Sequence, residues 1–165
     1  MDLYRTIISK RDTRAFLETP VPDDALRRIL QAGRMAGSSK NVQPCRFIVI
    51  DDQAVKEEIA RCGDFAAWTP TAPLLIAVAV SAQSTRGEYD AGRASQNMML
   101  TAWADGISSC PVSMHHVDCA RDTLGAPADF HISIVLAFGF SAKPRKHAPE
   151  AARLPFDEYV RRNRW

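Results

Sequence analysis

The sequence predicts a fold of the α/β or α+β class. Three or four apolar, strand-like segments alternate with segments of helical periodicity along the chain, and this interleaving is typical of both classes. The chain has 165 residues, 46% of them apolar and 24% charged, which is enough to bury a core and is typical of a globular protein. No repeat, low-complexity tract or linker divides it, so we expect residues 1–165 to form a single domain.

Two helices are predicted in the N-terminal part of the chain. Apolar residues within 3–8 recur at helical spacing and predict a short helix that ends at the charged run 10–14. Pro22 and the two aspartates after it mark the start of a second helix, because proline suits the first turn and acidic side chains suit the positive end of the helix dipole. The apolar stripe of this helix continues to about Met35.

Four strands and three further helices are predicted after the second helix. They are, in order, a strand over 46–50, a helix over 54–61, a strand over 74–80, a helix over 90–104, a short strand over 109–112, a helix over 118–124 and a strand over 132–140. The segment 74–80 is apolar at every position, so we expect it to be buried on both faces of a sheet. Gly106 is expected to end one helix and Asp118 to cap the next.

The region from Ser141 onward differs from the rest of the chain. It holds three prolines and eight Lys, Arg or His residues, which makes it too polar for a core. It also carries Leu154, Phe156, Tyr159 and Trp165, whose apolar surface favours burial. A neighbouring subunit is one surface that would bury them.

Charge and hydropathy exclude several classes of protein. Twenty-one Lys and Arg against nineteen Asp and Glu give a net charge of +2, which does not support nucleic-acid binding. The apolar run 72–80 is much shorter than the roughly 20 residues that span a bilayer, so no membrane association is expected. The first residues, with charges at Asp2 and Arg5, lack the apolar stretch of a secretory signal.

The cysteines and histidines do not indicate a metal site. Four cysteines, Cys45, Cys62, Cys110 and Cys119, form no CxxC pair, so neither a zinc ribbon nor a disulfide scaffold is indicated, and a reduced, cytoplasmic location is expected. The adjacent pair at 115–116 is followed by an aspartate and a cysteine. Because adjacent side chains point in different directions on a regular element, we interpret these histidines as surface or pocket-lining residues.

The sequence lacks the common catalytic motifs but contains two polar clusters. The sequence contains no GxGxxG, GxxxxGK[ST], GxSxG or HExxH motif. The run 10–14 holds three cations and one acid in five residues, and the loop 38–43 is dense in hydrogen-bonding groups. Taken alone, the first is typical of a solvated helix end and the second of a turn.

The order of these segments resembles the FMN-dependent nitroreductase family. RDTRAF is followed by PVPDDALRRILQAG, by the SSKNVQP loop that leads into RFIVI, by DAGRASQNMMLTA and GISSC, and finally by RLPF. The resemblance thus covers nearly the whole chain in the right order. It implies an α+β fold in which helices flank a central, mostly antiparallel mixed sheet. It also implies a homodimer with FMN at the subunit interface, in which the C-terminal segment reaches the partner subunit.

The resemblance assigns basic residues to the cofactor. Lys10 and Arg11 match positions that hold the flavin phosphate, where a dianion favours charge-assisted donors, and Arg153 matches a second phosphate-binding cation. Arg14 matches the basic residue near the N1 and O2 edge of the flavin, where a cation raises the reduction potential.

Further site residues follow from the two remaining motifs. Ser38, Ser39 and Asn41 match the loop that contacts the flavin from the other subunit. Ser113 and Met114 fall where family members present a backbone N–H to flavin N5.

Several positions depart from the family pattern. Asp12, which we include in the cofactor site, replaces a serine, and an Arg-Asp pair here also occurs in the flavin-cleaving enzyme of cobamide-ligand synthesis. Gly37 replaces a proline and Cys45 a tryptophan. Residues 65–69 lack the Asn and Lys that contact the uracil edge in some members, and 81–89 is too short for a substrate lid.

The resemblance implies an FMN-dependent NAD(P)H oxidoreductase. NAD(P)H would reduce the flavin and leave, and a small conjugated electrophile such as a nitroaromatic or quinone would then take the electrons, in a ping-pong reaction. No side chain is required as a catalytic acid or base. Two alternatives stay open: oxygen-dependent cleavage of the reduced flavin, which the Arg11–Asp12 pair suggests, and flavin storage without turnover, which the open site suggests.

Overall fold

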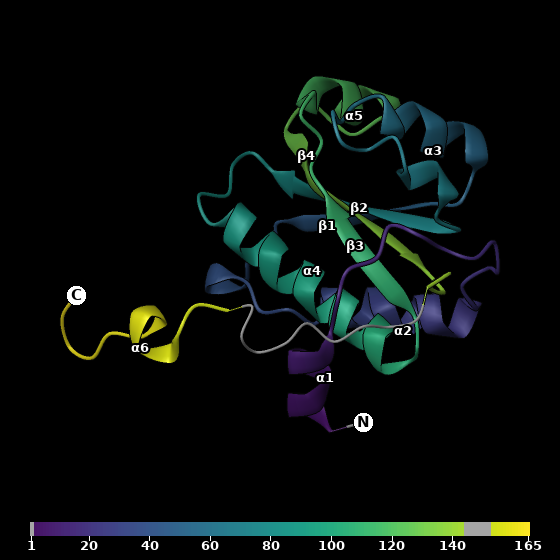
Figure 1. The fold of residues 1–165 in the computed structure, drawn as a ribbon. Helices are drawn as coiled ribbons and strands as arrows, with labels where there is room; N and C mark the ends of the chain where they lie inside the picture. Colours follow the sequence, from purple (N-terminus) through teal and green to yellow (C-terminus); the bar gives the residue numbers. More distant parts are fainter. Residues whose placement is uncertain (1, 144–152) are drawn as a thin grey trace.

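A four-stranded antiparallel sheet with helices on both faces organises the molecule (Figure 1). This computed structural model describes residues 2–143 and 153–165. The strands lie in the order β1-β2-β4-β3. Their bounds are β1 Cys45–Ile50, β2 Leu74–Ser81, β3 Ser108–Val112 and β4 Phe130–Gly139. The predicted mixed class is confirmed, and each predicted strand is present within two residues of its expected bounds.

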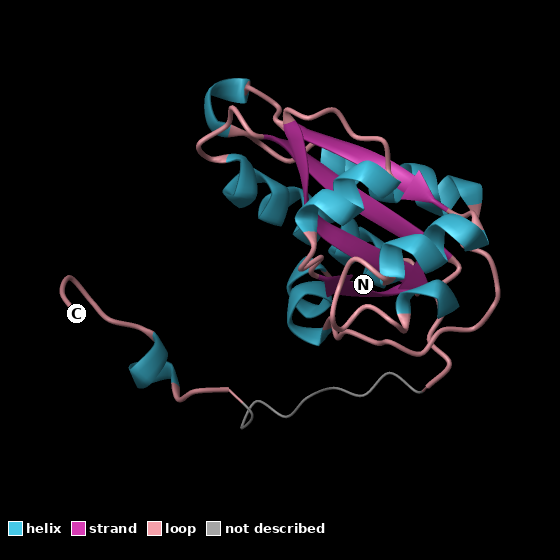
Figure 2. Cartoon of the chain, turned by 90° about the horizontal axis from the view of Figure 1, so that it is seen from above, coloured by secondary structure: helices cyan, strands magenta, loops and turns pink. Residues whose placement is uncertain are grey.

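The helices connect the strands and cover the sheet (Figure 2). Their bounds are α1 Leu3–Ser9, α2 Asp23–Arg34, α3 Gln53–Ala60, α4 Gly87–Ala104, α5 Val117–Thr123 and α6 Phe156–Tyr159, with 3-10 turns at Ser39–Asn41 and Thr69–Thr71. Gly106 follows α4 with a φ of 83°, a left-handed conformation that glycine adopts without a steric penalty. The prediction that this glycine ends the helix is confirmed.

Strand β2 lies at the centre of two hydrophobic clusters, one on each face of the sheet. Leu75, Ala77 and Ala79 pack in the cluster that includes residues of α3 and α5. Leu74 and Ile76, which alternate with them, pack in the cluster that includes α2 and α4. Because successive side chains of a strand point to opposite faces, a strand covered on both sides has to be apolar throughout. The predicted burial of this strand is confirmed.

The two edges of the sheet differ in whether another segment pairs with them. Strand β1 pairs with β2 only, so its outer edge has no strand partner among the described residues. At the other edge, Asp12 forms an isolated parallel bridge with Ser109 of β3. The N-terminal segment is thereby attached to the sheet, and it is the parallel element of an otherwise antiparallel arrangement.

The start of α5 differs from the prediction. His116, not Asp118, holds the cap position, with φ −100° and ψ 79°. Asp118 lies in the first turn, where its carboxylate accepts a hydrogen bond at 2.7 Å from Arg121 one turn further on. An ion pair along the helix therefore replaces the expected cap.

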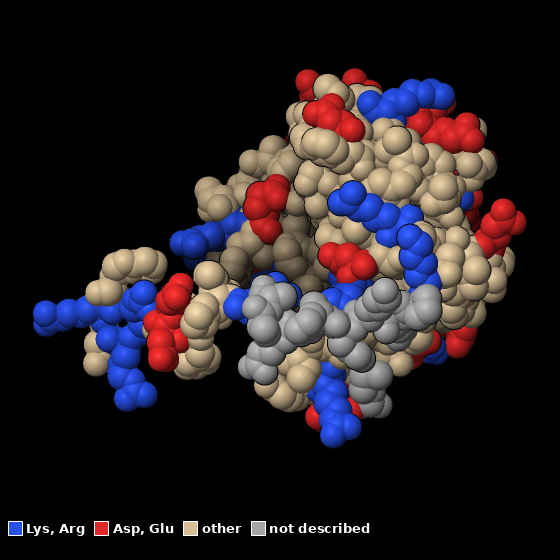
Figure 3. All heavy atoms as spheres, in the orientation of Figure 1, with Lys and Arg blue, Asp and Glu red and all other residues tan. Residues whose placement is uncertain are grey.

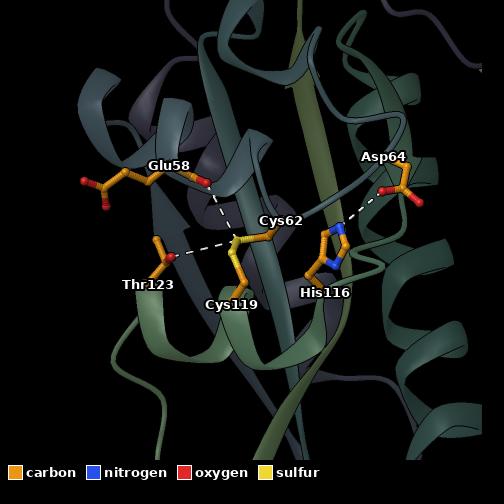
Figure 4. The surroundings of a disulfide bond; sticks show 6 residues. All are labelled: Glu58, Cys62, Asp64, His116, Cys119 and Thr123. Carbon is orange, nitrogen blue, oxygen red and sulfur yellow. Dashed lines mark hydrogen bonds and ion pairs between the residues drawn. A yellow bond between two sulfur atoms is a disulfide. The ribbon is translucent and has the colours of Figure 1, made fainter.

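A disulfide joins Cys62 to Cys119 (Figure 4). The expectation of cysteines without a disulfide is wrong for this pair. The two residues are 57 positions apart in the sequence, with Cα atoms 5.5 Å apart, because Cys62 follows α3 and Cys119 lies on α5, which pack together. Cys45 and Cys110 are free. Spacing along the chain gave no sign of this pairing because only the tertiary fold brings the two cysteines together.

The apolar side chains of α1 and of the C-terminal segment are exposed. Leu3 of α1 is 71% exposed, Phe156 of α6 is 76% exposed and Trp165 is fully exposed. The segment 153–165 stands away from the sheet and its helices in both ribbon views. Residues 144–152 of the predicted tail lie outside the described part of the chain. Within that part, no helix is long and apolar enough to cross a membrane.

Candidate functional site

The charged run after α1 is held against the third strand. The bridge between Asp12 and Ser109 is supported by a hydrogen bond of 3.2 Å from the Thr13 N–H to the Ser109 carbonyl. A further bond of 2.8 Å links the Leu17 N–H to the carbonyl of Phe140, just after β4. These contacts fix the backbone from residue 12 to 17 along one end of the sheet, so the side chains of 10–14 have defined neighbours.

Lys10, Arg11 and Asp12 form a compact charged group at the end of α1. The Lys10 ammonium hydrogen-bonds the Asp12 carboxylate and lies 3.5 Å from the sulfur of Met99 on α4. The Arg11 guanidinium donates to the carbonyl of Ile8 at 2.8 Å and to that of Lys10 at 2.6 Å. Lys10 and Arg11, two of the three residues that the resemblance assigns to the phosphate, thus lie in one charged group, and Asp12 of this group pairs with β3.

Arg14 lies beside an aromatic pair. Its guanidinium carbon is 5.6 Å from the centroid of the Trp68 ring, within the range of a cation–π contact, and Trp68 stacks on Phe16 with centroids 6.3 Å apart. Burial raises the pKa of the nearby Cys110 thiol, and the Arg14 guanidinium opposes that shift. Trp68 lies in the segment where some family members contact the uracil edge. The sequence therefore supplies an aromatic neighbour to Arg14 at that place.

Two buried polar atoms around this group have no hydrogen-bond partner among the described residues. They are the indole N–H of Trp68 and the hydroxyl of Ser109. A buried donor without a partner is uncommon in a folded protein, and one reason for it is a ligand that completes the site. Together with the cations of Lys10, Arg11 and Arg14, this donor set fits a phosphate and a heteroaromatic ring with carbonyl groups.

The loop 37–43 has an unusual backbone. Lys40, Asn41 and Gln43 have positive φ values of 51°, 56° and 49°, which side chains other than glycine rarely adopt. The Gln43 N–H donates to the Ser38 hydroxyl at 2.9 Å, and the Ser39 N–H donates to the carboxylate of Asp90 on α4 at 3.2 Å. The polar side chains of the loop are thus presented by a conformation that tertiary contacts hold.

Asp90 and Arg93 were not singled out from the sequence. Asp90 is only 3% exposed, and its carboxylate lies 3.8 Å from the Arg93 guanidinium. A Cβ atom on Gly37 would meet that guanidinium at 2.8 Å. The sequence does show an acid and an arginine three residues apart in DAGR, a spacing that permits an ion pair on a helix. Their contacts with the loop 37–43 are visible only in the structure.

The charged group and the loop contact α4 at different levels. Lys10 meets this helix at Met99, whereas the loop meets it at Asp90, nine residues earlier. At 1.5 Å per residue, the two contacts lie about 13 Å apart along the helix axis. One chain therefore presents the two halves of the predicted site at separate places.

The remaining predicted site residues, Ser113, Met114 and Arg153, belong neither to the charged run 10–14 nor to the loop 37–43. Ser113 is exposed, while the side chain of Met114 is 5% exposed and packs in the core. The prediction for this pair concerned backbone groups, which a buried Met114 side chain does not affect. Arg153 is exposed and begins the C-terminal segment 153–165, which stands away from the sheet and its helices in Figure 1.

The histidines after β3 face an aspartate. His116 Nε2 lies 3.2 Å from a carboxylate oxygen of Asp64, as Figure 4 shows, and the Asp64 N–H donates to His115 Nδ1 at 3.1 Å. In the described ranges, no three His, Cys, Asp or Glu side chains lie close enough to hold a metal ion. On the face drawn in Figure 3, Lys and Arg are interspersed with Asp and Glu and do not form one basic patch.

Comparison with known proteins gives the same family across the chain. The nitroreductase family pattern matches residues 7–69 and 62–140. A protein of Archaeoglobus fulgidus, named for NADH dehydrogenase and NAD(P)H nitroreductase activities, is 25% identical over 99% of both chains. The NADPH-flavin oxidoreductase of Vibrio harveyi is 22% identical over 97% of this chain and 73% of its own.

Solved structures show the same fold. The FMN-dependent nitroreductase of Clostridium difficile superimposes with a TM-score of 0.91 at 21% identity, covering 98% of this chain and 99% of the other. The family match spans most of the chain, and the site segments that carried the resemblance fall within it, apart from the C-terminal one. The chain therefore belongs to the nitroreductase family.

Proposed function

We propose that the protein is an FMN-dependent NAD(P)H oxidoreductase that reduces small conjugated electrophiles such as nitroaromatics or quinones. The observation that carries this proposal is that the charged group of Lys10, Arg11 and Asp12 lies between β3 and α4 while Arg14 lies beside Trp68. The buried donors of Trp68 and Ser109 in this region have no hydrogen-bond partner among the described residues. The names of relatives support it, since one is an NADPH-flavin oxidoreductase and another an FMN-dependent nitroreductase. The two-step, ping-pong order of the reaction is part of the proposal.

The residues of this chain would bind and orient the cofactor. Lys10 and Arg11 would hold the phosphate through charge-assisted hydrogen bonds, and Arg14 with Trp68 would lie at the pyrimidine edge of the ring. FMN, when bound, supplies the hydride chemistry, and the protein supplies orientation and electrostatics. A fixed cation at the pyrimidine edge stabilises negative charge there, which is why Arg14 is the residue that we assign to tuning.

We propose that the working unit is a homodimer in which each site takes the charged group from one subunit and the loop 37–43 from the other. The separation of about 13 Å between the two along α4 supports this arrangement. The exposed apolar residues of α1 and of the C-terminal segment also support it, since contiguous exposed apolar surface marks an interface.

One surface of the chain suits the C-terminal segment of a second copy. A groove of about 760 Å³ lies between α2 and the free edge of β1. Its apolar lining comes from Leu26, Leu30, Phe47 and Val49. An apolar groove beside an unpaired strand edge suits an extended segment that carries aromatic side chains. We propose that the partner's residues 153–165 occupy it.

One preparation tests the function. Purified protein should take up FMN, turn yellow and bleach within seconds when NADH or NADPH is added without oxygen. Subsequent addition of a quinone should restore the colour. Protein that does not take up FMN contradicts the assignment at its root, and yellow protein that neither nucleotide bleaches would instead support flavin storage. Release of dimethylbenzimidazole on aerobic incubation with reduced flavin would support the cleavage alternative.

A cytoplasmic location stays part of this proposal. The disulfide bears on it, because stable disulfides are uncommon in reducing compartments. Thiol titration of protein that is alkylated at the moment of cell lysis would show whether Cys62 and Cys119 are oxidised where the protein works.

A further inference from the structure

Asp90 is a buried carboxylate whose partners belong to a loop and to its own helix. Asp90 is the fourth residue of α4 and is 3% exposed. Its two oxygens are used differently, since Oδ2 accepts the Ser39 N–H at 3.2 Å and Oδ1 lies 3.8 Å from the Arg93 guanidinium. A carboxylate that has been removed from water at a desolvation cost is retained where such partners compensate it.

The loop that it contacts has a conformation that needs support. Three of its residues, Lys40, Asn41 and Gln43, have positive φ values, and each non-glycine residue in that region carries a conformational cost. Such a backbone persists only when surrounding contacts hold it. Hydrogen bonds inside the loop, such as the one from the Gln43 N–H to the Ser38 hydroxyl, and a bond of 2.9 Å from the Arg46 guanidinium to the Gln43 carbonyl contribute to holding it. The Ser39–Asp90 bond attaches the loop to α4.

Arg93 forms a second contact between α4 and the loop, at Gly37. A Cβ atom on Gly37 would stand 2.8 Å from a guanidinium nitrogen of Arg93, and this guanidinium lies over the ring of Tyr89 at 5.8 Å from its centroid. Gly37 replaces the proline that is usual in the family, and a Cβ atom at this position would require the Arg93 guanidinium to shift. Arg93 therefore contacts both Gly37 and Asp90.

We propose that Asp90 and Arg93 are positioning residues that hold the loop 37–43 in the conformation in which Ser38, Ser39 and Asn41 meet the flavin of the partner subunit. This inference rests on the proposed function, because it takes the loop to be part of the flavin site. Asp90 acts through the Ser39 backbone, and Arg93 acts by packing against Gly37 while it pairs with Asp90.

Two measurements distinguish the effect of Asp90 on the order of the loop from its effect on FMN binding. Lys40 is exposed within the loop, so the rate at which trypsin produces the fragment ending at Lys40 reports loop order in protein without FMN. The FMN dissociation constant, from quenching of flavin fluorescence, reports the site. We expect Asp90→Ala to raise the cleavage rate at least fivefold and to weaken FMN binding about tenfold, the scale of one hydrogen bond to a charged group.

The conservative variant separates positioning from general stability. In Asp90→Asn the amide oxygen still accepts the Ser39 N–H but the charge pairing with Arg93 is lost, so both values should lie between those of wild type and those of Asp90→Ala. Glu57→Ala, an exposed acid on α3 at the other face of the sheet, is the matched control and should change neither. A second pair of variants tests the contact between Gly37 and Arg93 without changing Asp90. Gly37→Ala should weaken FMN binding about threefold in the wild-type protein, because its methyl group displaces the Arg93 guanidinium, and should have no effect in an Arg93→Ala background.

The outcomes are distinct. Unchanged cleavage at Lys40 in Asp90→Ala overturns the anchor. Faster cleavage with unchanged FMN affinity overturns the link between this loop and the flavin, while the proposed function survives on the charged group. If wild-type protein binds no FMN, the proposed function fails, and the flavin role of Asp90 fails with it even if the cleavage rates confirm the anchor.

Discussion

Asp12 sits beside the cation that is assigned to the flavin phosphate. Its carboxylate pairs with Lys10, whose side chain is largely covered, while Asp12 itself is half exposed. A phosphate dianion arriving at Lys10 would face this carboxylate, because like charges close together repel. If Lys10 holds the phosphate as proposed, Asp12 would lower the affinity that this cation provides.

Replacing Asp12 should tighten FMN binding. In Asp12→Ser the repulsion is lost and Lys10 is released, so we expect affinity to increase by about 0.5–1 kcal/mol, roughly two- to fivefold, the value of a partly exposed charge pair. Fluorescence titration at two salt concentrations measures it, and the gain should shrink at high salt. Weaker binding in Asp12→Ser would mean that Asp12 itself contacts the flavin.

Cys45 should be an unreactive thiol. Burial, together with the nearby Asp90 and Glu88 carboxylates, raises the pKa of Cys45 to about 11. Because only the thiolate reacts, its fraction at neutral pH is roughly 100-fold lower than for an exposed cysteine. Iodoacetamide labelling followed by peptide mass spectrometry should show slow modification that accelerates up to about pH 11. Labelling at the rate of free cysteine at pH 7 would contradict the burial seen here.

At the scale of elements, the strands were predictable and some of their connections were not. Residues 74–80 predict a buried strand because an uninterrupted apolar run suits a strand that is covered on both faces, and the structure contains that strand. Asp118 pairs with Arg121 and does not cap its helix, and the sequence alone does not reveal this pairing. The charged run 10–14 was found by composition and family pattern. Asp90 was missed because a buried acid on a helix has meaning only through the loop above it.

The disulfide between the end of α3 and α5 should stabilise the fold. It closes a loop of 57 residues in the unfolded chain, so we expect its loss to cost roughly 2–4 kcal/mol and to lower Tm by roughly 5–15 °C. Thermal unfolding with and without reductant measures this, and the double variant Cys62→Ser, Cys119→Ser is the control that should no longer respond to reductant. Four titratable thiols in denatured, unreduced protein would show that the bond is not formed.

For the whole molecule, the proposed dimer makes the C-terminal segment part of both the subunit interface and the flavin site. Arg153 is exposed at the start of this segment, and the exposed aromatic residues follow it. We expect Arg153→Ala to weaken FMN binding by roughly 1.5–3 kcal/mol, the value of one charge-assisted hydrogen bond, without changing the sedimentation coefficient. Unchanged affinity in calorimetry or fluorescence titration would remove Arg153 from the site.

If one flavin site is built from two copies of the chain, as proposed, subunit complementation should restore it. One variant carries Lys10→Ala and Arg11→Ala, and the other carries Asp90→Ala, so that each homodimer has two defective sites. If each site joins the charged group of one subunit to the loop of the other, a mixed dimer contains one intact site. Random exchange should then restore roughly a quarter of the wild-type FMN sites. Mixed protein that binds no more FMN than the separate variants would contradict the shared site.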